Sequence, residues 1–131
     1  MRRALVVAAV LLGLAGCYVG PRDGTFAPAN GPRGITADLR LKGSRIQGEL
    51  LEVQDTALLM LRDERVLLVP LRAIRRGRFG GRGAWVGGGE VRGKVLTRLR
   101  LMSRFPAGLT PEMRTKLLAA QGQTDIEGVA P

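Results

Sequence analysis

The chain is poor in the residues that most often carry chemistry. It has no histidine, one cysteine, one tryptophan, one tyrosine and three phenylalanines. Without histidine there is no imidazole to act as a general base, and a metal site of the cysteine and histidine type is excluded. A single cysteine cannot form an internal disulfide. Stability must therefore come from an aliphatic core, for which leucine, isoleucine and valine are abundant.

What the chain does have is a distinctive N-terminus. Arg2 and Arg3 precede an apolar run, Ala4 to Gly16, which is shorter than the roughly 20 residues of a membrane-spanning helix. Positive charge, a short apolar run and small residues before a cleavage point are typical of a secretory signal peptide. The same run is also compatible with an uncleaved membrane anchor or a buried core helix.

The apolar run ends in Leu14-Ala15-Gly16-Cys17, which resembles the lipobox of bacterial lipoproteins. The resemblance implies that a diacylglycerol is attached to the Cys17 sulfur and that signal peptidase II cuts between Gly16 and Cys17. Tyr18 follows, where an aspartate would resemble the inner-membrane retention signal. We therefore expect a lipid-anchored protein of the cell envelope, with the periplasmic face of the outer membrane favoured.

Composition and periodicity divide the rest of the chain. Proline and glycine without a hydrophobic period indicate a flexible tether before the folded part. Thr110 and Pro111 predict a helix N-terminus, and Gly122 predicts its end. The expected segments are a signal peptide (1–16), a tether (17–34), a small β-barrel (35–80), a glycine-rich loop (81–94), a helical segment (95–122) and a tail (123–131).

The segment 35–80 has the pattern of short strands. Apolar and polar residues alternate from Ile35 to Lys42, which predicts a strand with one buried face. The alternation slips near 48–51, and a slip beside a glycine indicates a bulge or sharp bend. Further strands are expected over 57–61 and 65–69, then a helical turn over 71–74 and an edge strand over 76–79. For 95–105 a helix is favoured over a strand.

These strands resemble the first motif of Sm-like and SH3-like small barrels. The matching positions are Gly43, Gly48, Leu50, Asp55 and the apolar run 58–61. The resemblance implies a mainly β fold, a small five-stranded antiparallel barrel with one or two α-helices, and self-association into a homo-oligomer through open strand edges. The family's RNA-contacting asparagine is replaced here by Leu59, which argues against nucleic acid as a partner.

Positive charge is concentrated in the second half of the chain. The formal net charge is +10, and ten basic residues but one acid, Glu90, lie between Arg72 and Arg104. Such a stretch attracts anions such as anionic lipid, lipopolysaccharide phosphates or acidic wall polymers, although it is also compatible with a simply solvated face. The expected anion-binding residues are Arg72, Arg75, Arg76, Arg78 and Arg82.

No motif indicates catalysis, a cofactor or a metal. Glu49 and Glu52, the best carboxylate pair for glycoside chemistry, would lie on opposite faces of a regular strand. We therefore expect a non-catalytic binding or scaffolding module, held to the membrane by its N-terminal lipid. The alternatives are a nucleic-acid binder of the Sm-like class, an accessory subunit of an envelope complex, and a carboxylate-based hydrolase.

Overall fold

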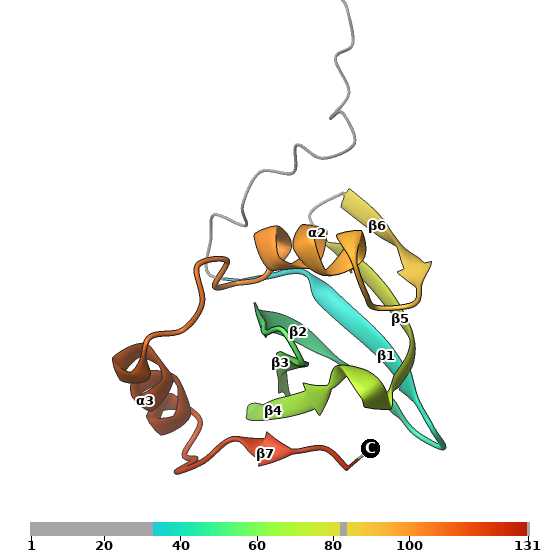
Figure 1. The fold of residues 1–131 in the computed structure, drawn as a ribbon. Helices are drawn as coiled ribbons and strands as arrows, with labels where there is room; N and C mark the ends of the chain where they lie inside the picture. The colour runs from blue at the N-terminus through green and yellow to red at the C-terminus, as the bar shows by residue number, and fades with distance from the viewer. Residues whose placement is uncertain (1–32, 82–83, 131) are drawn as a thin grey trace, which may run out of the picture.

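The fold is known from a computed structural model, which describes residues 33–81 and 84–130, with the backbone alone at 84–88. Six strands pair in antiparallel fashion, and a two-residue seventh pairs in parallel (Figure 1). The strands are β1 (Thr36–Leu41), β2 (Arg45–Val53), β3 (Ala57–Arg62), β4 (Arg65–Pro70), β5 (Ile74–Gly81), β6 (Ala84–Gly89) and β7 (Glu127–Gly128). The helices are a 3-10 turn, η1 (Leu71–Ala73), and the α-helices α2 (Lys94–Met102) and α3 (Pro111–Ala120).

The seven strands form one mixed sheet that does not close. Their order is β6-β5-β1-β2-β3-β4-β7, so β5 pairs with β6 and β4 pairs with β7 instead of with each other. The mainly β fold with helices is confirmed, but the predicted five-stranded barrel is wrong. Closure would need β4 and β5 as free partners, and each has its outer edge occupied by a strand that the sequence did not reveal.

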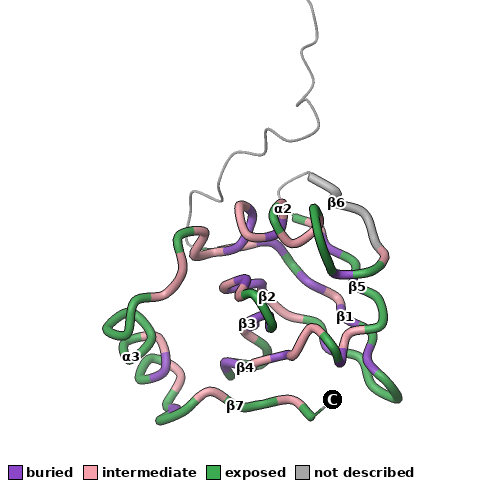
Figure 2. Tube along the Cα trace, in the orientation of Figure 1, coloured by how far each residue is buried: buried purple, intermediate pink, exposed green. Residues whose placement is uncertain are grey.

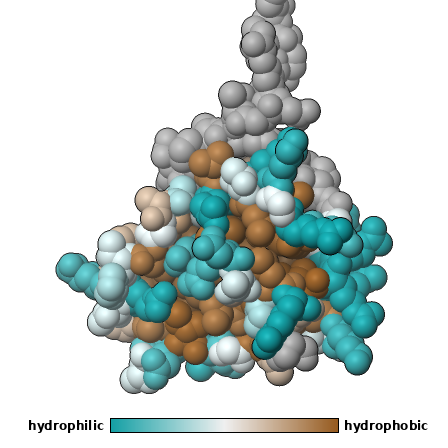
Figure 3. Space-filling view, in the orientation of Figure 1, coloured by the Kyte–Doolittle hydropathy of each residue, from teal (hydrophilic) through white to brown (hydrophobic). Residues whose placement is uncertain are grey.

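Two apolar clusters hold the fold together, one on each side of the central strands. The larger cluster joins Leu39, Leu50 and Phe79 to Leu99 of α2. The smaller one joins Leu51 and Leu59 to Leu118 of α3. Buried residues accordingly concentrate along β1 to β4, while the outward side of α3 is exposed (Figure 2). Hydrophilic side chains gather on the side of the molecule that carries β1 and β5 (Figure 3).

The predicted slip in the second strand is confirmed as a bulge. Leu50 pairs with Met60 and Glu52 with Leu59, which leaves Leu51 as the extra residue. Leu50 and Leu51 are both fully buried, one in each cluster. Consecutive side chains of any strand face opposite sides of the sheet. The bulge shifts this phase, so that Leu50 and Val53, three residues apart, both face the larger cluster.

The turn between β3 and β4 is strained. Arg62 pairs with Arg65, so the loop has two residues, Asp63 and Glu64, with φ of 47° and 61°. Left-handed backbone costs an ordinary residue about 1–2 kcal/mol, and turns of this kind favour Asn-Gly. We expect Asp63→Asn with Glu64→Gly to raise the free energy of unfolding by about 1 kcal/mol in urea titrations. An unchanged or lower value would contradict this description of the turn.

Three further segments differ from their prediction, and two agree. The predicted edge strand, β5, is paired on both sides by β1 and β6. The predicted loop 81–94 contains β6, and the predicted tail 123–131 contains β7 together with the buried Gln123. A helix over 94–102 agrees with the favoured reading of that segment. The Thr110 hydroxyl accepts a hydrogen bond from Met113 N at 3.2 Å, which confirms the predicted N-cap of α3.

Candidate functional site

The outer surface of β5, β1 and β2 carries an arginine-rich patch. Residues that alternate with the buried positions on each strand point away from the core, and their registers bring them side by side. Arg40 of β1 lies opposite Arg76 of β5 and opposite Arg45 of β2, while Asp38 lies opposite Arg78. We call these five residues the basic face. Its four guanidinium groups and one carboxylate give the basic face a formal charge of +3.

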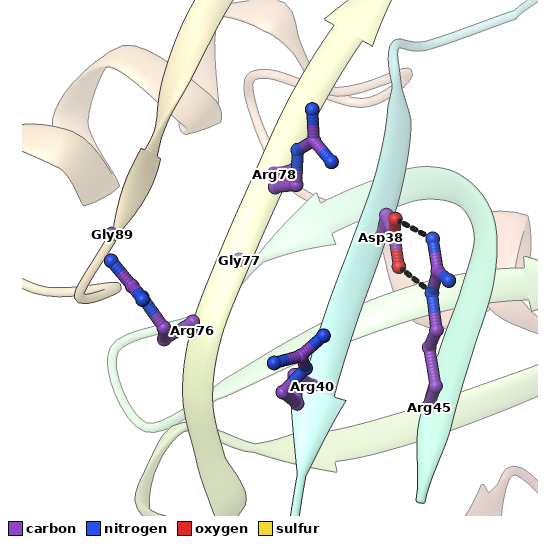
Figure 4. Close-up of a pocket in the computed structure, with 7 residues that line it drawn as sticks. All are labelled: Asp38, Arg40, Arg45, Arg76, Gly77, Arg78 and Gly89. Atoms are coloured by element: carbon purple, nitrogen blue, oxygen red, sulfur yellow. Dashed lines mark hydrogen bonds and ion pairs between the residues drawn. The ribbon is translucent and has the colours of Figure 1, made fainter.

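The basic face is hollowed. Its five residues line a depression of about 370 Å³, together with Gly77 of β5 and Gly89 of β6. Figure 4 shows Arg45 on one side of Asp38, and Arg40, Arg76 and Arg78 on the other. At Gly89 an added Cβ would meet no atom within 4 Å, so the wall formed by β6 leaves room beside the arginines, whereas a Cβ at Gly77 would point into the core toward Phe79 and Val91. The geometry suits a small anion better than a flat charged strip would.

One ion pair organises the depression. Arg45 donates from Nε to Asp38 Oδ1 at 2.7 Å and from Nη2 to Oδ2. This bidentate geometry fixes both side chains. The Asp38 side chain is 18% exposed and that of Arg45 is 62% exposed. Hydrogen bonds from Arg45 hold the pKa of Asp38 below its usual value, the charges of Arg45, Arg78 and Arg40 add to this, and partial burial opposes it. Asp38 is therefore ionised at neutral pH.

Arg40 and Arg76 have no comparable partner. Neither forms a hydrogen bond or ion pair through its side chain with any residue in the described part of the chain. They stand directly across from each other on neighbouring strands, and like charges in that position destabilise a sheet. The Arg76 side chain extends toward Gly89 of β6, away from Arg40 (Figure 4), and an anion bound in the depression would draw the two guanidinium groups toward it. Arg40 and Arg76 are the residues best placed to hold a ligand.

The arginines that the sequence predicts as one anion-binding group do not all lie together in the structure. Arg76 and Arg78 lie on the basic face. Arg75 is the extra residue of a bulge, since its neighbours Ile74 and Arg76 pair with successive residues of β1. Arg72 belongs to η1 and lines a separate depression beside Asp55 and Leu71. Arg82 lies outside the described residues, as do Gly16 and Cys17 and the side chain of Trp85.

Sequence reasoning missed Asp38, Arg40 and Arg45. The signal was present, because Thr36, Asp38 and Arg40 are the polar partners in the alternation that predicts β1. That alternation predicts only that they lie on the solvent-facing side of a strand. The sequence around Arg40 does not show that Arg76, which follows it by 36 residues, lies across from it on the neighbouring strand.

The structure places the two glutamates considered for catalysis, Glu49 and Glu52, against other groups of the fold. The bulge in β2 brings Glu49 and Glu52 to the same face of the strand, because an extra residue between them restores the phase. Glu49 Oε1 accepts a hydrogen bond from Gly34 N at 2.7 Å and lies 3.5 Å from Arg104 Nε. Glu52 Oε2 is buried without a hydrogen-bond partner among the described residues. Glu49 therefore ties the start of the folded part to β2.

Asp38 gives the protein a specific sensitivity to acid. Its pKa is lower in the folded chain than in the unfolded chain, so its contribution to stability is present above about pH 4 and is lost as pH falls through the folded value. We expect Asp38→Asn to lose less stability than the wild type between about pH 6 and pH 3 in urea titrations. Equal losses for both proteins would show that the Arg45 pair does not stabilise the fold.

Comparison with known proteins gives no match, whether with protein-family models, curated proteins or solved structures. Within the described ranges, neither α-helix has the length and apolar character needed to cross a membrane. The same part of the chain holds no group of three or more acidic, cysteine or histidine side chains placed to bind a metal ion. Leu59, which the predicted resemblance to Sm-like barrels aligns with an RNA-contacting asparagine, is fully buried in the cluster that contains Leu118 of α3.

Proposed function

We propose that this chain is a lipid-anchored protein of the bacterial cell envelope that binds phosphate-bearing anions through its basic face and catalyses no reaction. The observation that carries the proposal is the pair Arg40 and Arg76, opposed across two strands in an open depression and without partners among the described residues. Guanidinium groups bind phosphate through paired, charge-assisted hydrogen bonds.

The expected anchor supports a membrane surface as the source of the anion. The tether that composition predicts over 17–34 would span roughly 20–25 Å, which would keep the folded part close to the lipid headgroups. The chain enters the folded part immediately before β1, which carries Asp38 and Arg40. At such a surface each arginine contributes about 1 kcal/mol of attraction to anionic lipid. Lipid headgroups and lipopolysaccharide phosphates are thus the favoured ligands.

Salt dependence of vesicle binding tests the anion-binding proposal. The full chain with Cys17→Ser, which carries no lipid, is mixed with phosphatidylcholine vesicles with or without phosphatidylglycerol. The neutral vesicles measure the contribution of the apolar N-terminus alone. We expect the anionic vesicles to bind about tenfold more tightly at low salt, and the ratio to approach one at about 0.5 M salt. A ratio near one at low salt would reject the proposal.

The anchor is tested independently by labelling. In the native host, labelled palmitate should enter the wild-type chain and not the Cys17→Ser variant. Mass spectrometry should find that Cys17 is the first residue and carries the lipid. An intact Met1 together with a free thiol would reject the envelope location and leave an uncleaved anchor or a buried helix as the description of residues 4–16.

A further inference from the structure

The depression on the basic face holds a negative group as well as positive ones. Asp38 sits at its side with one oxygen engaged by Arg45 Nε and the other by Arg45 Nη2. A carboxylate has about four lone-pair sites, so each oxygen keeps capacity to accept one more hydrogen bond. Arg45 approaches from one side and the depression opens on the other, toward Arg40 and Arg76 (Figure 4).

A site that binds only a simple anion would not need this carboxylate. Asp38 lies opposite Arg78, next to Arg40 along β1, and its negative charge weakens the attraction of the depression for any anion. The hydrogen bonds from Arg45 keep Asp38 ionised, so Asp38 remains a hydrogen-bond acceptor across the physiological pH range. The arrangement of two partnerless cations beside a fixed acceptor fits a ligand that carries both a negative group and a hydrogen-bond donor.

We propose, on the basis of the anion-binding function above, that the depression recognises a phosphate ester bearing a hydroxyl group. Arg40 and Arg76 bind the phosphate, and Asp38 accepts the hydrogen bond of a hydroxyl on the ester group. Asp38 is then a specificity-determining residue. A hydroxyl fits better than an ammonium group, because four guanidinium groups against one carboxylate repel a second cation. Glycerol and sugar phosphates, free or as lipid headgroups, have this chemistry.

Three phosphate monoesters that carry different donors on the ester group separate the possibilities. Methyl phosphate has no donor, glycerol 3-phosphate has hydroxyls, and phosphoethanolamine has an ammonium group. The full chain in a nonionic detergent is titrated with each, and binding is followed by NMR on the arginine Nε–H signals. We expect glycerol 3-phosphate to bind about tenfold more tightly than methyl phosphate, with phosphoethanolamine weaker than glycerol 3-phosphate.

Asp38→Asn supplies the decisive comparison. It should reduce the preference for glycerol 3-phosphate, because a neutral amide oxygen is a weaker acceptor than a carboxylate, and strengthen the binding of methyl phosphate, because the repulsive charge is gone. Asp55→Asn, which alters an exposed carboxylate paired with Arg100 elsewhere, is the matched control and should leave both affinities unchanged. If Asp38→Asn changes all three affinities equally, or if phosphoethanolamine binds most tightly, the specificity proposal is overturned.

The outcomes also separate this proposal from the one on which it rests. If none of the esters binds the wild type, anion binding itself fails. If all bind with equal affinity, anion binding stands and the role of Asp38 fails. Vesicles containing phosphatidylglycerol, compared with vesicles containing phosphatidic acid, identify the source. A preference for phosphatidylglycerol that Asp38→Asn reduces assigns the ligand to a lipid headgroup, whereas a preference seen only with glycerol 3-phosphate assigns it to a free ester.

Discussion

Replacing Gly48 by alanine should lower the free energy of unfolding by about 3 kcal/mol, a large fraction of the roughly 5–15 kcal/mol of an ordinary domain. A Cβ at this position of β2 would lie 3.1 Å from the carbonyl carbon of Leu61 and would overlap its oxygen. The obstacle is backbone of the neighbouring strand, which cannot rotate away as a side chain can. The pairing of β2 with β3 would have to open at the site where Glu49 meets Leu61.

Gly128→Ala is the matched control for this substitution. Gly128 also lies in a strand, β7, but a Cβ there meets no atom within 4 Å. Its free energy of unfolding should stay within about 0.5 kcal/mol of the wild type, as for most surface changes. Urea titration of both variants measures the difference. Equal stability of the two variants would contradict the close approach of β2 and β3.

Gln123→Leu should cost about 2–4 kcal/mol, since it removes one partner of buried polar groups and leaves the others unpaired. Gln123 is 8% exposed, and its side-chain amide bridges both backbone groups of one residue in β4. Val66 N donates to Gln123 Oε1 at 2.6 Å, and Gln123 Nε2 donates to Val66 O at 3.3 Å. Leucine supplies similar volume but neither a donor nor an acceptor, so two backbone groups of Val66 would lose their partners.

The same change at a neighbouring glutamine controls for hydrophobicity. Gln121 ends α3, and its side chain forms no hydrogen bond with a described residue. Gln121→Leu should therefore alter the free energy of unfolding by less than about 0.5 kcal/mol. Amide hydrogen exchange adds a local test, because protection at Val66 N should fall in Gln123→Leu and persist in Gln121→Leu. Full protection in both variants would show that the C-terminal segment does not hold β4.

Side-chain periodicity made most of the central sheet predictable. The alternation from Ile35 to Lys42 marked β1, and two adjacent buried leucines marked the bulge in β2. The strands that were missed pair mainly through their backbones. β6 contains three glycines among six residues, and β7 has only two residues. Such segments carry little side-chain pattern, so only the tertiary structure reveals that they occupy both edges of the sheet and prevent closure.

The site was less predictable than the fold for a physical reason. A run of arginines in the sequence suggests one patch, but a strand sends successive side chains to opposite sides and a bulge displaces others. Arg75 and Arg72 are thus separated from Arg76, whereas Arg40 and Arg45 join it from distant positions. Charge composition indicated an anionic ligand, and strand register decided which arginines lie together.

Two double variants test the central claim most directly. One removes two positive charges from the basic face, and the other removes two positive charges from elsewhere on the surface. Arg40→Gln with Arg76→Gln removes the opposed pair, and Arg72→Gln with Arg114→Gln removes two exposed arginines outside the depression. Both double variants have the same net charge, and both carry Cys17→Ser. On phosphatidylglycerol vesicles at low salt, we expect the first variant to bind about tenfold more weakly and the second to change less than about twofold. Equal losses would mean that net charge alone attracts the chain to the membrane, which would contradict a binding site on the basic face.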